Sequence, residues 1–71
     1  MAEDEQITDL RQIDLPFRRI AMLREVKYDS GLRMLRLVLR EGRRITQIDL
    51  DTDAAAALGE ALIEHAGLPR A

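Results

Sequence analysis

The side chains that could do chemistry in this sequence are few and lie far apart along the chain. Ser30 is the only serine and His65 is the only histidine, so a serine–histidine pair would need two distant segments to meet. The sequence has no cysteine, which leaves neither a disulfide nor a thiolate metal ligand. One histidine does not assemble a zinc site within a single chain. We therefore predict no catalytic residues, no metal and no cofactor.

A short acidic series is the remaining candidate for a metal site. Asp49, Asp51 and Asp53 have the spacing of the first half of a calcium loop, but the glycine and the distal glutamate of such a loop are missing at the required offsets. Asp51 or Thr52 is better interpreted as a helix N-cap, with Asp53 as a first-turn charge. The sequence indicates a non-enzymatic protein with no evident small-molecule substrate.

Charge is divided unevenly along the 71 residues. Residues 1–17 and residues 45–71 each carry five acidic side chains against one arginine, a net charge of −4 for each segment. Residues 18–44 carry nine basic side chains against three acidic ones, a net charge of +6. This asymmetry fits an anionic partner, and it fits equally a basic sheet that is neutralised by acidic segments of the same molecule.

Two turn signals divide the middle of the chain into strands. Apolar and β-branched residues fill 19–28, 32–40 and 43–50, and the breaks contain Gly31 and Gly42, which predicts two consecutive hairpins. With Ser30–Gly31 and Glu41–Gly42 as two-residue loops, Leu35 would face Val26, and Leu37 would face Arg24. That register avoids setting Arg24 against Arg36. Residues 7–17 are predicted to be extended, and the sequence does not decide whether they add a fourth strand to the sheet.

The predicted register gathers one apolar set on the inner face of the sheet. Its members are Ile20, Met22, Val26, Leu35, Leu37, Leu39, Ile48 and Leu50.

A helix is predicted for residues 52–66. Ala55, Leu58, Leu62 and Ala66 recur at helical spacing, and Gly67 followed by Leu68 and Pro69 is a strong stop signal. Gly59 costs an isolated helix about 1 kcal/mol relative to alanine, and we expect it to allow close packing on the sheet.

These elements predict an α+β fold: a three-stranded antiparallel meander, open to a fourth strand, followed by one C-terminal helix packed on one face. Residues 1–6 are predicted to be a disordered acidic tail, and residues 7–71 are predicted to be one small domain. No apolar run approaches the roughly 20 residues needed to span a bilayer, and the first residues are acidic rather than basic. We expect a soluble cytoplasmic protein.

The predicted outer face of the sheet is a candidate interface. Leu23, Val38 and Ile45 form an apolar row in this register, with Met34 beside it and Arg36 at its rim. Apolar centres with polar rims are typical of protein–protein interfaces. A domain this small buries only about 60% of its unfolded surface, so self-association is a natural source of stability. We predict a homodimer, or binding to another protein, through this face.

A basic meander followed by a helix gives an alternative. Over residues 18–66 this order resembles, in architecture alone, Whirly-type and related single-stranded-DNA-binding transcriptional coactivators. The resemblance implies that a single strand would lie along the sheet and that bases would stack on aromatic side chains, for which the chain offers Phe17 and Tyr28. The residues that would bind nucleic acid are Arg36, Arg40, Arg43 and Arg44.

Overall fold

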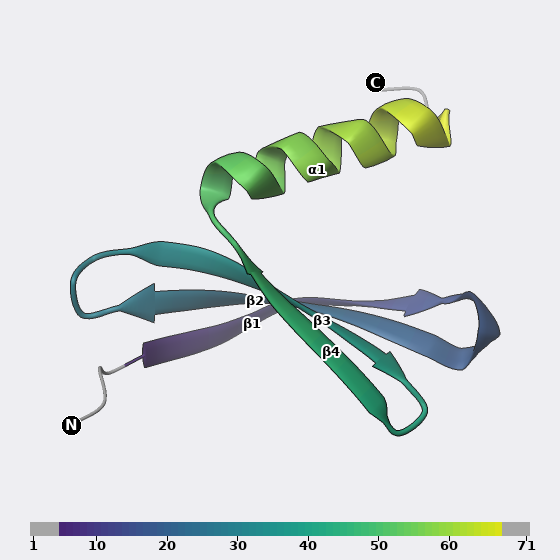
Figure 1. Ribbon diagram of the computed structural model, residues 1–71, viewed down its shortest axis with the longest axis horizontal. Coiled ribbons are helices and arrows are strands. Elements are labelled where there is room, and N and C mark those ends of the chain that lie inside the picture. The colour runs from purple at the N-terminus through teal and green to yellow at the C-terminus, as the bar shows by residue number, and fades with distance from the viewer. Residues whose placement is uncertain (1–4, 68–71) are drawn as a thin grey trace.

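A computed structural model describes residues 5–67 of the chain. These residues form an antiparallel sheet with strand order β1-β2-β3-β4, followed by one helix, and this confirms the predicted α+β fold (Figure 1). The strands are strongly twisted across one another (Figure 1). The elements are β1 (Glu5–Leu15), a 3₁₀ turn (Pro16–Arg18), β2 (Arg19–Tyr28), β3 (Arg33–Glu41), β4 (Arg44–Leu50) and α1 (Thr52–Ala66).

Residues 7–15, which belong to the extended segment predicted for residues 7–17, lie in β1 and add a fourth strand to the sheet. β1 pairs with β2 along its whole length, with a bulge between Asp9 and Arg11. The bulge changes the alternation of the strand, so that Asp9 pairs with Arg24 whereas Arg11 pairs with Leu23. Residues 1–4 of the predicted acidic tail lie outside the described residues, and residues 5–6 belong to β1.

The predicted register of the first hairpin is wrong by one residue, and its turn explains why. The amide of Gly31 donates to the carbonyl of Tyr28, and the amide of Tyr28 donates to the carbonyl of Leu32, both at 2.9 Å. The loop therefore has three residues rather than two. Gly31 has a φ of 93°, and a left-handed residue at the end of a three-residue loop is a common hairpin geometry.

The extra loop residue shifts the pairing of β2 with β3 by one residue. Side chains that were predicted to share a face of the sheet therefore lie on opposite faces. Arg24 lies opposite Arg36, and Leu23 lies opposite Leu37. The second hairpin turns at residues 42–43, where Gly42 has a φ of 59°. Its register differs from the prediction by two residues, so Leu37 pairs with Ile48 on an unchanged face.

The apolar set that was predicted for the inner face is consequently divided between the two faces of the sheet. Directly paired residues share a face, and successive residues alternate. We call the side that lies toward α1 the helix face, and its apolar members are Ile13, Leu15, Ala21, Leu23, Leu35, Leu37, Leu39, Ile48 and Leu50. The opposite face holds Ile7, Ile20, Met22, Val26, Met34, Val38 and Ile45.

Burial is sparse throughout the described residues. Only Val26 and Val38 are buried there, with 0% and 3% of their surfaces exposed, and both lie on the opposite face. On the helix face, Leu23, Leu35 and Leu37 are half-buried. The small core therefore lies on the side of the sheet away from the helix.

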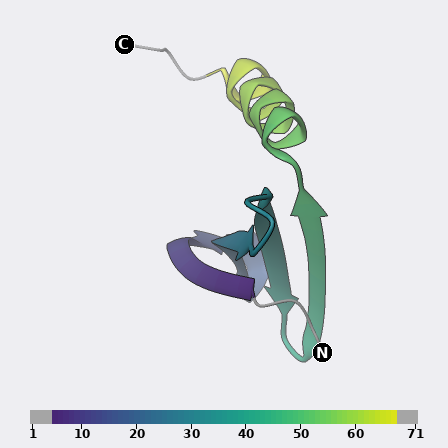
Figure 2. The ribbon, with the colours of Figure 1, turned by 90° about the vertical axis from the view of Figure 1, so that its left-hand side faces the viewer.

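Helix α1 begins and ends where the sequence predicts. The amide of Ala54 donates to Oδ1 of Asp51 at 2.7 Å, which caps the N-terminus, and Gly67 ends the helix with a φ of 74°. The helix contacts β3 and β4, and Figure 2 shows it standing clear of most of the sheet. No described helix is both long and apolar enough to cross a membrane.

The loop between β1 and β2 has an unusual backbone. Phe17 and Arg18 have φ values of 64° and 61°, in the left-handed region that glycine normally occupies. Phe17 is 85% exposed, and the Arg19 guanidinium carbon lies 5.7 Å from the centre of its ring. The sequence has no glycine here, so it gave no signal for this conformation.

Candidate interaction site

An apolar groove lies between helix α1 and the helix face of the sheet. Its volume is about 380 Å³. The sheet and the helix both contribute to it, and every lining residue is apolar: Ile13, Leu23, Leu35, Leu37, Leu50, Ala55, Leu58, Gly59 and Leu62.

Two regular spacings in the sequence build the groove. Alternate residues of β2 and β3 point to the helix face, which brings Leu23, Leu35 and Leu37 together. On α1, Ala55, Leu58 and Leu62 recur at intervals of three and four residues, so they form one stripe. The same periodicities predicted an amphipathic helix and an apolar sheet.

The groove is open rather than filled. Leu58 is 43% exposed and Leu62 is 63% exposed, although both line it. Ile13 and Ile48 on the sheet side are 50% and 52% exposed. None of the residues of α1 is buried. The sequence predicts that Leu58, Leu62 and Ile48 belong to the core, because periodicity indicates which face of an element is apolar but not how closely two faces approach.

A row of charges crosses the opposite face of the sheet. Asp9, Arg24, Arg36 and Asp49 pair in that order on β1, β2, β3 and β4. Nε of Arg36 donates to Oδ1 of Asp49 at 2.7 Å, and Nη2 donates to Oδ2 at 3.1 Å. These bonds hold the pKa of Asp49 below its usual 3.8 and raise the pKa of Arg36.

The other half of the row is less well paired. Nε of Arg24 lies 3.0 Å from Oδ1 of Asp9, but it is buried and has no hydrogen-bond partner among the described residues. Nη2 of Arg24 lies 3.9 Å from the sulfur of Met22. The contact between Arg24 and Asp9 is therefore an ion pair without hydrogen-bond geometry.

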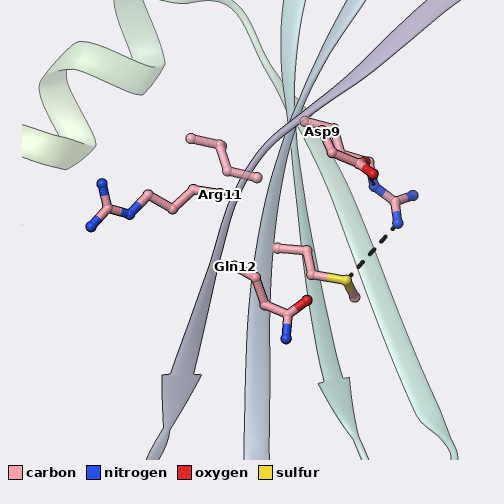
Figure 3. Close-up of a pocket in the computed structure, with 6 residues that line it drawn as sticks. Asp9, Arg11 and Gln12 are labelled. Carbon is pink, nitrogen blue, oxygen red and sulfur yellow. Dashed lines mark hydrogen bonds and ion pairs between the residues drawn. The ribbon is translucent and has the colours of Figure 1, made fainter.

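A small hollow of about 190 Å³ surrounds the β1 bulge. Asp9 and Arg11 both line it, and Figure 3 shows them pointing to opposite sides of the strand. Gln12, Met22, Leu23 and Arg24 complete its lining. Asp9 and Arg24 pair with each other at its border, whereas Arg11 forms no ion pair within residues 5–67.

The predicted interface residues do not form one surface. Leu23 lies on the helix face, whereas Met34, Arg36, Val38 and Ile45 lie on the opposite face. The apolar row Leu23–Val38–Ile45 therefore does not exist. Val38 is also buried, and Arg36 is bound by Asp49. The groove residues Ala55, Leu58 and Leu62 were missed as a site, since their helical stripe was interpreted as core.

The predicted nucleic-acid residues are also separated. Arg36 and Arg40 share the opposite face, Arg43 lies in the second turn, and Arg44 pairs with Glu41 on the helix face. Phe17 precedes β2 and Tyr28 ends it, so the two aromatic rings lie at opposite ends of that strand.

The fold and the groove together define a small four-stranded α+β domain with an open helix–sheet groove. The chain belongs to a family of unknown function, DUF6967, whose model matches residues 4–67. No curated protein and no solved structure matches it.

Proposed function

We propose that the chain is a small non-catalytic interaction or accessory module that binds a protein segment in the groove between α1 and the sheet. The observation that carries the proposal is the groove itself, which leaves Leu58 and Leu62 exposed beside an apolar sheet face. Apolar surfaces of this kind mark sites where another macromolecule docks. The absence of cysteine fits a cytoplasmic setting.

The lining of the groove favours a protein over a small molecule. Ligand sites combine apolar walls with a few polar groups that orient the ligand. None of the nine lining residues of this groove has a polar side chain. An apolar stripe of another polypeptide needs no such orienting groups, because shape and area determine how it packs.

The groove replaces the face of Val38 as the proposed contact surface. Val38 is buried and Arg36 is held by Asp49, so neither is free to meet a partner. The dispersal of Arg36, Arg40, Arg43 and Arg44 over different surfaces favours protein binding over nucleic-acid binding.

Solution mass by size-exclusion chromatography with light scattering tests the proposal, with one groove variant and one matched control. Leu62→Asp places a charge in the groove, whereas Leu32→Asp places the same charge in the first turn, where Leu32 is 55% exposed. We expect the Leu62→Asp variant to lose self-association of the chain and the Leu32→Asp variant to keep it. A chain in which Leu58 and Leu62 are protected from solvent within a monomer would contradict the proposal.

A further inference from the structure

We infer that the occupant of the groove is helix α1 of a second copy, so that two chains form a two-fold dimer whose helices pack against each other at Gly59 and cover each other's sheets. This inference rests on the proposed function, because it names the partner for the same groove. Four observations carry it.

The first observation is the width of the apolar surface on α1. The stripe of Leu58 and Leu62 lines the groove, and Ile63 lies beside it with 38% of its surface exposed. Ala56 and Ile63 lie beside Gly59 at helical spacing, and unlike Gly59 they do not line the groove. A surface helix needs one apolar stripe to pack on its own sheet. The apolar surface of α1 therefore extends past the groove at Ala56 and Ile63, where another helix can pack.

The second observation is that Gly59 makes no close approach to another part of the chain among the described residues. A methyl group added at Gly59 would meet nothing within 4 Å. The expectation that this glycine brings α1 close to its own sheet is therefore wrong. Its φ is not in the left-handed range either, so alanine would fit and would favour the helix. Close approach of a partner's backbone explains the glycine.

The third observation is surface area. Three large apolar side chains of α1, Leu58, Leu62 and Ile63, are 43%, 63% and 38% exposed. On the helix face of the sheet, Ile13 and Ile48 are 50% and 52% exposed. A stable interface buries about 800 Å² on each partner, and both elements offer exposed apolar surface for one.

The fourth observation is charge. Helix α1 carries Asp53, Glu60 and Glu64, and none of them forms an ion pair within residues 5–67. The helix face of the sheet carries Arg11 and Arg44, which have no ion-pair partner within the same range. In the dimer, the acidic helix of each chain lies against the basic helix face of the other chain's sheet.

The test is the dimer dissociation constant of Gly59→Ala, measured by analytical ultracentrifugation. Alanine should raise the dissociation constant about tenfold or more, because its methyl group separates two helices in contact, while circular dichroism shows equal or higher helicity. Ala57→Leu is the matched control. It adds bulk to the other side of α1, and it should leave the dissociation constant unchanged.

A second measurement locates the helices directly. Because the chain has no cysteine, Ala56→Cys and Ile63→Cys each carry a single thiol, and only an interchain disulfide can form when the two variants are mixed. We expect the mixed disulfide to form efficiently under mild oxidation. Ala57→Cys mixed with Ile63→Cys should not form it efficiently.

The outcomes separate this inference from the proposed function. A dimer that Leu62→Asp disrupts but Gly59→Ala does not, without the mixed disulfide, would overturn helix exchange and keep the groove as a binding site. A monomer with Leu58 and Leu62 open to solvent would also overturn the second copy as partner, and would leave the groove for a different protein. A monomer with the groove closed would overturn both.

Discussion

Arg24 and Arg36 lie directly opposite each other on β2 and β3, although like charges in such a pair are normally destabilising. A carboxylate on each outer strand offsets the repulsion: Asp9 beside Arg24 and Asp49 beside Arg36. The stability of the sheet should therefore depend on these two carboxylate side chains.

Asp49→Asn should destabilise the chain at pH 7 and flatten its response to acid. The pKa of Asp49 is lower in the folded chain than its usual 3.8, owing to the hydrogen bonds from Arg36. Its contribution is therefore present above about pH 4 and is lost as pH falls further. Urea unfolding between pH 7 and pH 2.5 measures this. Asp14→Asn, an exposed change on β1, should keep the wild-type slope, and an equal slope for Asp49→Asn would contradict the prediction.

Val38→Asp should unfold the chain rather than only separate an assembly. Val38 is 3% exposed in the small core, and burying a carboxylate without a partner costs several kcal/mol. Circular dichroism and urea titration measure the loss. Ile45→Asp, at a position that is 60% exposed on the same face, is the control and should remain folded. A folded Val38→Asp would mean that this face is not the core.

Arg18→Gly should stabilise the chain by about 1 kcal/mol, because glycine adopts the left-handed backbone without the strain that a Cβ imposes. Arg18 has a φ of 61° and a side chain that is exposed. Arg19→Gly is the contrasting variant: its φ of −102° suits any residue, and glycine there also removes the ion pair with Glu41, so it should destabilise. Thermal unfolding of both variants gives the comparison, and equal losses would count against the strained loop.

Asp51→Ala should lower stability by about 1 kcal/mol, since it removes the oxygen that accepts from the amide of Ala54. Helical signal in circular dichroism should fall with it. Thr52→Ala is the control, because the side chain of Thr52 makes no cap and alanine favours a helix. An unchanged helix in Asp51→Ala would show that packing on β3 and β4 is sufficient to hold it.

The sequence predicted the helix and the positions of the hairpins, but it did not predict the strand register, which depends on the length of one turn. The helix bounds and both of its caps follow from Asp51, the alanine run and Gly67, and the structure confirms them. The hairpins follow from Gly31 and Gly42. The register does not follow from the sequence, because Asp-Ser-Gly fits a loop of two residues and a loop of three residues equally well. A difference of one residue in the loop moves the side chains of a strand to the other face of the sheet.

The candidate site was missed for a related reason. Arg24 opposite Arg36 is unfavourable for β2 and β3 alone, whereas the carboxylates that neutralise the pair lie on β1 and β4. Likewise, the apolar stripe of α1 was visible in the sequence, but the space between it and the sheet depends on the direction in which the chain leaves β4. Only Asp51 separates Leu50 from Thr52. The backbone angles of this single residue set the direction, and no residue pattern specifies them.

The strand order has a consequence for how the chain folds during its synthesis. Each strand pairs with the next one in sequence, so every ladder can zip outward from its own tight turn without closing a long loop. Chains with such local contacts fold quickly. The sheet can therefore form hairpin by hairpin as synthesis proceeds, with the helix added last. The apolar groove would then exist only after α1 has formed on the sheet, and only from that point would a second chain bind it.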